Sequence, residues 1–399
     1  MLFYNGIIYP IASEPIPCGY VRVENDKITA VGAGTIPPKE GEKVVDLQGK
    51  RLYPGFFDCH THLGMWEDGL DFEGDDGNEE TDPITPQLRA IDAVNPLDHC
   101  FQEALESGVT TVVTGPGSAN PIGGQMAALK TAGRRIDRMI LKAPLAIKMA
   151  LGENPKNVYN GKSQTPMTRM ATVALIREQL FKAKEYLEQL QKAEESRLDP
   201  EAEELDKPEF DLKCEALLPA LKREIQVHFH AHRADDIFTA VRLGEEFNLD
   251  YVIIHCTEGH LITEDLNEIG AKVTSGPFLS DRSKPELKNL TAKSPGLLSK
   301  SGLRPAVITD HPVIPIQYLR LCAGLAAAEG MDYDEALKSV TLYPAQVCNL
   351  ADRIGSIEVG KDADLTVFSG DPLTLGSKPE LVMVNGKIQF TQKEAVPNE

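Results

Sequence analysis

Short apolar runs that alternate with helical stretches are the feature that most constrains the fold of this chain. β-prone runs lie at 108–115, 145–152, 225–232, 251–256, 271–276 and 305–310, and the patterning predicts helices at 169–191 and 334–350. Strands that alternate with helices favour a parallel sheet with crossover helices. Residues 53–353 are numerous enough for eight such units, so the sequence predicts an α/β fold with a closed (β/α)8 barrel as the catalytic domain.

The two ends of the chain have a different pattern from the middle. Residues 1–52 and residues 354–399 each contain short β-prone runs separated by turn signals, including an Asn-Gly step near either end. Asn-Gly between β-prone runs is typical of a tight hairpin. We therefore expect both ends to combine in one small β-sandwich module that flanks the barrel.

Composition excludes several functional classes. The formal net charge is −19 and there is no cluster of Lys and Arg, which argues against a nucleic-acid or anionic-membrane surface. Seven cysteines without a Cys-x-x-Cys pair suit reduced thiols, and the N-terminus lacks a signal-peptide pattern. We expect a cytoplasmic protein with a small-molecule substrate; the sequence leaves open whether it is a homo-oligomer.

Histidines and one aspartate stand where the predicted barrel strands end. Active sites of such barrels lie at the carboxyl ends of the strands. In the run IQVHFHAH the histidines occupy every second position, so they share one face of a strand. The residues placed at strand ends are His60, His62, His230, His232, His255 and Asp310, whereas His228 lies deeper on the same face of its strand.

One histidine at a strand end is more often structural than a ligand, but four such strand ends reverse that expectation. Imidazole and carboxylate groups are ligands of Zn²⁺, Fe²⁺ and Mn²⁺, and alternate positions on a strand let two rings reach one ion. The sequence therefore predicts a divalent metal site, with Zn²⁺ as the first choice and Fe or Mn as alternatives.

These motifs resemble the amidohydrolase superfamily, and GPGSANPIGGQMAALKTAG leans toward its imidazolonepropionase-like branch. The resemblance rests on YPGFFDCHTHLG, HFHAH, VIIHC, VITDHPV and GSIEVGKDADLTVF, which follow one another in the expected order along nearly the whole chain. It implies a metal-dependent hydrolase in which one or two ions bind per chain. His60, His62 and Asp310 match the ligands of a first metal, and His230 and His255 match those of a second.

The resemblance leaves the number of metals open. In mononuclear members His230 would join the first set, and the counterpart of His255 positions a water molecule. Binuclear members often bridge the ions with a carboxylated lysine at the end of the fourth strand, where AIKMA places Lys148. Glu153 is the rival bridging ligand because some relatives use a glutamate, and an ordinary salt bridge is the structural alternative for Lys148.

Three nearby features receive separate interpretations. We expect His228 to be structural, and His232 and Arg233 to contact substrate, although Arg233 can equally pair with Asp235 or Asp236. The acidic stretch 67–82 is read as a solvated loop, with a lid or a steering patch for a cationic substrate as the alternative.

The predicted reaction is hydrolysis of a C–N bond in a small linear or cyclic amide, such as an N-acyl amino acid or a dipeptide-like molecule. A metal-activated water attacks, and Asp310 serves as general base and then general acid. A mononuclear deaminase is the runner-up, for which Glu258 and His260 are the nearest proton-transfer pair. A non-catalytic binding protein on the same fold is a third reading, weakened because each expected type of ligand is present.

Overall fold

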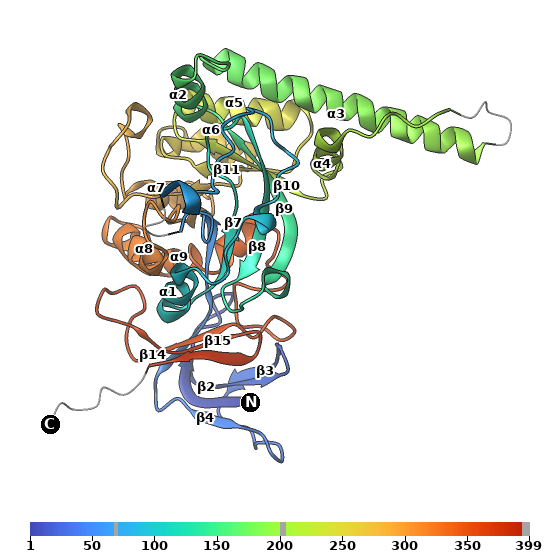
Figure 1. The fold of residues 1–399 in the computed structure, drawn as a ribbon. Helices are drawn as coiled ribbons and strands as arrows, with labels where there is room; N and C mark the ends of the chain where they lie inside the picture. Colours follow the sequence, from blue (N-terminus) through green and yellow to red (C-terminus); the bar gives the residue numbers. More distant parts are fainter. Residues whose placement is uncertain (68–70, 200–204, 393–399) are drawn as a thin grey trace.

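The computed structural model describes residues 1–67, 71–199 and 205–392. Figure 1 shows a sheet built from both ends of the chain beneath a larger α/β body, from which one long helix projects. Among the described residues, no helix combines the length and the apolar character needed to cross a bilayer.

Strands from both termini form one continuous hydrogen-bonded sheet of eight strands. Its order is β16-β15-β14-β5-β1-β2-β3, with β4 paired to β1, and β14 lies antiparallel to β5. One core of apolar side chains from both segments, including Phe3, Val23, Leu365 and Met383, holds it together. The strands are β1 Leu2–Ile8, β2 Ile16–Glu24, β3 Lys27–Ala33, β4 Val44–Asp46, β5 Arg51–Pro54, β14 Leu365–Phe368, β15 Pro379–Val384 and β16 Lys387–Thr391.

The central body is built on a nearly closed barrel of strands. Six strands pair in the order β11-β10-β9-β8-β7-β6, and β12 pairs with β13. A parallel bridge from Ile253 to Val273 connects β11 to the segment that leads into β12. The strands are β6 Phe56–Thr61, β7 Val109–Thr114, β8 Ile122–Lys130, β9 Ile140–Ala150, β10 Gln226–Ala231, β11 Tyr251–His255, β12 Thr274–Ser275 and β13 Ala306–Val307.

Strict alternation of parallel strands and helices does not hold at β8. This strand runs antiparallel to both β7 and β9, although β7 lies parallel to β6 and β9 lies parallel to β10. The connection from β7 to β8, residues 115–121, is too short for a crossover helix, so the chain reverses directly. The predicted (β/α)8 arrangement is therefore wrong at this position.

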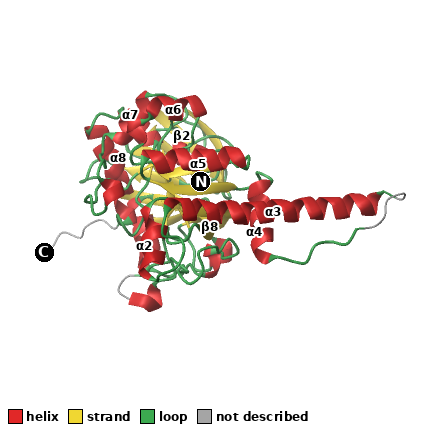
Figure 2. Cartoon of the chain, turned by 90° about the horizontal axis from the view of Figure 1, so that it is seen from above, coloured by secondary structure: helices red, strands yellow, loops and turns green. Residues whose placement is uncertain are grey.

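The helices surround the barrel (Figures 1 and 2). The predicted helix at 169–191 is longer than expected: it begins at Arg169, where Thr168 caps it, and continues to Leu198, so that its far end projects from the body. The helices are α1 His99–Ser107, α2 Glu153–Gly161, α3 Arg169–Leu198, α4 Leu212–Leu221, α5 Ala234–Glu246, α6 Thr263–Ile269, α7 Ser294–Lys300, α8 Leu319–Ala328, α9 Tyr333–Lys338 and α10 Leu342–Val347.

The single helix predicted at 334–350 is two short helices, α9 and α10. The carbonyl of Ser339 accepts a hydrogen bond from the amide of Val307 in β13, and the carbonyl of Val340 accepts one from Phe57 in β6. These carbonyls cannot also serve an uninterrupted helix, so α9 ends here. The break joins β13 to β6 on the side where the barrel is otherwise open.

Candidate metal centre

The histidines of the three motifs stand at the carboxyl ends of their strands. His60 is the last residue but one of β6, and His62 follows the end of that strand. His230 and His232 have the same positions relative to β10, and His255 is the last residue of β11. On β10 the apolar residues Val227 and Phe229 pack in a core outside the site, as the alternating pattern predicts. The opposite face of β10 therefore carries the histidine side chains.

A first group of ligand atoms comes from His60, His62 and Asp310. The Nε2 atom of each histidine lies 3.3 Å from Oδ1 of Asp310. One donor atom from each of the three residues lies within 4.8 Å of the other two. All three side chains are largely buried, and the Asp310 carboxylate keeps 15% of its surface exposed.

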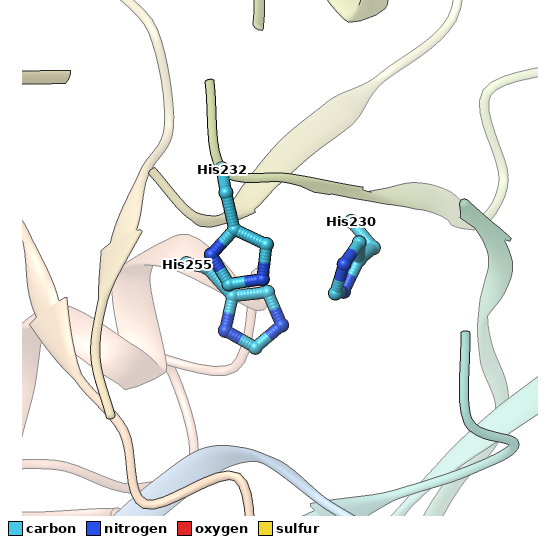
Figure 3. Close-up of side chains that lie close together, drawn as sticks. All are labelled: His230, His232 and His255. Carbon is cyan, nitrogen blue, oxygen red and sulfur yellow. The ribbon is translucent and has the colours of Figure 1, made fainter. Parts of the chain in front are cut away.

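A second group comes from His230, His232 and His255 (Figure 3). Their ligand nitrogens also lie within 4.8 Å of one another. The rings of His232 and His255 are stacked with centroids 4.4 Å apart, and the ring of His230 stands nearly perpendicular to both. The two groups adjoin, because the ring centroids of His60 and His255 are 5.3 Å apart.

Hydrogen bonds orient four of these rings through Nδ1. A backbone carbonyl can only accept, so Nδ1 carries the proton in His62 and in His255, and Nε2 keeps its lone pair. In His230 and His232 the partner of Nδ1 is a hydroxyl. The bonds are His62 to Gly115 O at 2.7 Å, His255 to Gly276 O at 2.8 Å, His232 to Thr257 Oγ1 at 2.7 Å and His230 to Ser118 Oγ at 2.8 Å.

Burial favours the neutral form of His60, His230 and His255, and the neighbouring imidazoles keep Asp310 ionised. It lowers the pKa of His255 to about 4 and holds the pKa of His60 and of His230 well below the ordinary value. Burial alone would raise the pKa of Asp310, but the surrounding imidazoles outweigh it and hold that pKa well below its usual range. Neutral imidazole and ionised carboxylate are the forms that bind metal.

The backbone at two of these residues is strained. His255 and Asp310 have φ values of +71° and +54°, in the left-handed region that side-chain-bearing residues seldom adopt. Such conformations cost about 1–3 kcal/mol each and cluster at functional sites. Here both strained residues belong to the groups of potential ligands, so the unusual backbone directs their side chains into the site.

Lys148 lies beside the first group. It is fully buried on β9, next to His228 of β10, and its Nζ is 3.2 Å from Nε2 of His60. Burial lowers the pKa of its amine to about 8. A substantial share of the amine is therefore neutral near that pH, which is the nucleophilic form that carboxylation needs.

Glu153, the alternative to Lys148 as the bridging residue, lies away from the histidines and contacts Glu286 instead. Its carboxylate accepts a hydrogen bond from the amide of Glu286 at 3.2 Å, and its own amide donates to Oε2 of Glu286 at 3.1 Å. Glu153 belongs to neither ligand group. The structure thus brings Lys148 to the histidines and binds Glu153 to a neighbouring loop.

The remaining predicted residues separate into two sets. His232 joins the second ligand group, and Arg233 forms a two-pronged pair with Asp235 at 2.9 and 2.8 Å, away from the cavity. His228 is fully buried, and burial lowers its pKa to about 3. Of the two readings for Arg233, its geometry matches the ion pair.

A cavity of about 720 Å³ opens above both groups, and His62, His230, His232 and Asp310 line it. Three residues of the acidic stretch 67–82, Glu67, Asn78 and Glu80, lie on its wall, whereas 68–70 fall outside the described residues. Sequence analysis missed the other polar lining groups, because they lie on loops without a recognisable spacing. They are Ser118, Asn154, Asn157, Ser280, Ser283 and Lys284.

Glu286 is a further residue that the sequence did not reveal. It is fully buried, and its Oε1 lies 3.5 Å from Nε2 of His232 and 3.7 Å from Nε2 of His230. It belongs to a 3-10 turn, Pro285–Leu287, that packs against the start of α2. Glu286 thus places a negative charge beside the Nε2 atoms of the second group.

The barrel and its two groups of potential metal ligands point to a class of barrel protein with a metal site, and comparison with known proteins gives the family. The model of the amidohydrolase family matches residues 51–393. The chain belongs to the amidohydrolase family.

Individual relatives agree with this assignment. The amidohydrolase tasK of Hapsidospora irregularis is 34% identical over 93% of this chain, which spans only 40% of that protein. An imidazolonepropionase of Fusobacterium nucleatum is 25% identical, with 93% of this chain and 91% of that protein covered. A crystal structure of an amidohydrolase from Thermotoga maritima is 42% identical with a TM-score of 0.92, covering 98% of this chain and 100% of that one.

Proposed function

We propose that the protein is a metal-dependent hydrolase that cleaves a C–N bond in a small linear or cyclic amide. One observation carries the proposal: two adjoining groups of buried imidazoles and an ionised carboxylate present His62, His230, His232 and Asp310 to one cavity. The cavity has the volume of a small-molecule site.

The side chains present fit divalent metal ions. Nitrogen and carboxylate donors of this kind suit Zn²⁺ first and Fe²⁺ or Mn²⁺ as alternatives. His60, His62 and Asp310 would hold one ion, and His230 and His255, with His232 beside them, a second. A bound divalent ion polarises a carbonyl oxygen and lowers the pKa of water.

Lys148 is our candidate for the group between the two sites. Its amine is buried, its pKa is lowered, and it lies against His60 rather than against any carboxylate. Reaction of the neutral amine with CO₂ gives a carbamate, whose negative charge would offset the repulsion between two cations. An unmodified ammonium would instead add a buried positive charge to the site, which is unfavourable.

Asp310 is positioned to carry the proton. Its carboxylate is ionised, partly exposed to the cavity, and held by His60 and His62. It accepts a proton from the attacking water and gives it to the leaving nitrogen, which balances the hydrolysis of an amide to a carboxylate and an amine. His255, fixed by the Gly276 carbonyl and with its ring centroid 5.3 Å from that of His60, would orient the attacking water.

The deaminase alternative gains no support from Glu258 and His260. Both oxygens of Glu258 are engaged, by Asn289 and by the amide of Ala234, and His260 bonds to the carbonyl of Thr257. Neither residue lines the cavity.

Metal analysis combined with a substrate screen tests the proposal. Purified protein is stripped of metal, reconstituted with Zn²⁺, Fe²⁺ or Mn²⁺, and assayed on N-acyl amino acids, dipeptides and cyclic amides. We expect metal-dependent release of an amine. Protein that binds no divalent metal, or whose hydrolysis is unchanged by its removal, would contradict the proposal.

A further inference from the structure

One cation stands on the wall of the active-site cavity. Among the described residues that line it, Lys284 is the single Lys or Arg, and 28% of its side chain remains exposed. The surrounding groups on that wall are neutral and polar, from Ser280, Ser283 and Asn154. A positive charge is therefore presented to whatever occupies the cavity.

Two acceptors fix the position of this ammonium. Nζ of Lys284 lies 2.7 Å from Oε1 of Glu286 and 2.9 Å from Oδ1 of Asn154. A lysine ammonium has three N–H donors, and the hydrogen bond to Asn154 uses one of them, so donor capacity is left for a ligand. A preorganised donor loses less entropy on binding than a free surface lysine does.

The same contacts place the ammonium beside the ligand histidines. Oε1 of Glu286 lies between Nζ of Lys284 and Nε2 of His232, which is 3.5 Å from that oxygen. Asn154, the other partner of Lys284, has its Nδ2 3.3 Å from Nε2 of His230. An anion on Lys284 would thus be only a short distance from the histidine group.

Glu67 and Glu80, two acidic residues that also line the cavity, already have partners. Glu80 already pairs with Lys162 at 2.8 Å, and the carboxylate of Glu67 accepts a hydrogen bond from Asn95 at 2.6 Å. Arg233, the cation that the sequence suggested for a substrate carboxylate, is paired with Asp235 away from the cavity. Lys284 is also paired, with Glu286, but unlike Arg233 it lines the cavity, so it is the candidate anion-binding group.

We infer that Lys284 binds an anionic group of the substrate, so that the enzyme selects amides that carry a carboxylate close to the scissile bond. This inference rests on the proposed function and restricts its substrates to amides with a carboxylate. N-acyl amino acids and dipeptides belong to this class, whereas neutral cyclic amides do not. Lys284 acts in specificity, by contact with a part of the substrate that does not react.

Equilibrium binding tests the inference without requiring turnover. Isothermal titration calorimetry compares a panel of N-acetyl amino acids with the corresponding carboxamides, on metal-free and on metal-loaded protein. Wild-type protein should prefer the carboxylates in both forms. Loss of a charge-assisted hydrogen bond should weaken carboxylate binding by about 10- to 100-fold in Lys284→Met and leave the carboxamides unchanged.

Further variants separate binding from folding. Lys284→Arg keeps the charge and should retain the preference, and Lys288→Met removes an exposed lysine of the same segment and should change nothing. Because Lys284→Met leaves the buried Glu286 uncompensated, the double variant Lys284→Met/Glu286→Gln gives a folded, neutral reference.

Each outcome decides the question. Equal affinity of wild-type protein for carboxylates and carboxamides across the panel, or an undiminished preference in the folded double variant, would overturn the role of Lys284. A preference that depends on Lys284 in protein that hydrolyses no amide would keep the anion site and reject the proposed reaction instead.

Discussion

The candidate metal centre consists of histidines whose polar rings are buried although burial of a polar group is costly. His60 and His62 lie against one carboxylate oxygen in a region from which water is largely excluded. In their absence Asp310 would lose the partners that lower its pKa. Their joint removal should therefore abolish the first metal site rather than weaken it.

We expect the His60→Ala/His62→Ala double variant to lose at least one metal equivalent per chain, measured by plasma mass spectrometry on folded protein. His99→Ala is the control, because His99 is an exposed histidine with 73% of its side chain accessible. Full metal stoichiometry in a folded double variant would show that the metal lies elsewhere.

Asp310→Asn tests the proton-transfer role. The amide has nearly the same shape but cannot accept the proton, so kcat should fall by about 10²–10⁴. Metal content is measured in the same sample, since loss of a ligand alone would also reduce the rate. Metal-loaded Asp310→Asn protein with wild-type kcat would remove Asp310 from the mechanism.

The two candidates for the residue that bridges the metals, Lys148 and Glu153, lead to opposite predictions for metal content. Lys148→Ala should lose the second metal equivalent, and short carboxylic acids should partly restore it by supplying a carboxylate in place of the carbamate. Glu153→Ala should keep both equivalents, because Glu153 bonds to the amide of Glu286 and not to the histidines. The reverse pattern of metal content would make Glu153 the bridging residue.

Sequence reasoning finds these residues because strand alternation is strictly periodic. A repeat of two places His230 and His232 on one face, and the strand ends bring distant motifs together. It misses Glu286 and Lys284, which lie on a loop whose path depends on packing against α2 rather than on any repeat. For Arg233, sequence cannot decide between substrate and the neighbouring Asp235.

At the scale of elements, the turn from β9 into α2 supports the cavity wall. Gly152, between them, has φ +85°, and a Cβ there would lie 2.7 Å from Oε2 of Glu286 and 3.2 Å from Oδ2 of Asp236. A side chain would be strained by its backbone and would push the Glu286 carboxylate away from the histidines. Only glycine fits both requirements.

Gly152→Ala should therefore destabilise the protein by about 1–3 kcal/mol, measured by urea unfolding, and should weaken metal binding by displacing Glu286. Gly161→Ala, at the other end of α2, has open space around its Cβ and should be neutral or slightly stabilising. Equal effects of the two changes would argue against strain at Gly152.

Element boundaries show where local pattern gives way to tertiary contacts. The start of α3 at Arg169 could be read from the sequence, since Thr168 caps it. The division of α9 from α10 could not, because it depends on hydrogen bonds from β13 and β6 to Ser339 and Val340. The reversal at β8 follows from a short Gly- and Pro-containing connection, a signal present in the sequence at residues 115–121.

At the scale of the whole molecule, a buried aspartate connects the terminal sheet to the barrel. Asp362 lies in the sequence between α10 and β14, and its side chain is fully buried. It pairs with Lys27 of β3 at 2.6 Å, with Lys130 of β8 at 3.0 Å and with Arg353 at 2.8 Å. One carboxylate thus holds residues from both ends of the chain and from the barrel.

The charge of Asp362 should make the union of sheet and barrel sensitive to pH. Burial alone would raise its pKa, but Arg353, Lys130 and Lys27 together outweigh burial and lower the pKa to about 2. A carboxyl whose pKa is lower in the folded state than in the unfolded state stabilises the protein above the unfolded value, near 3.8. That contribution is lost as the pH falls toward 2.

We therefore expect Asp362→Asn to lower the free energy of unfolding at pH 7 by about 2 kcal/mol, because a neutral amide replaces the carboxylate that Lys27, Lys130 and Arg353 share, while Lys130 keeps Asp364 as a partner. The difference from wild-type protein should be nearly constant from pH 7 down to about 5 and should shrink at lower pH, because the Asp362 carboxyl takes up a proton in the unfolded state before it does so in the folded state. Denaturant unfolding at a series of pH values measures it, with Asp352→Asn, an exposed residue of the same segment, as the control. A difference that stayed constant below pH 4, or that matched the control, would mean that Asp362 does not join the two parts through its charge.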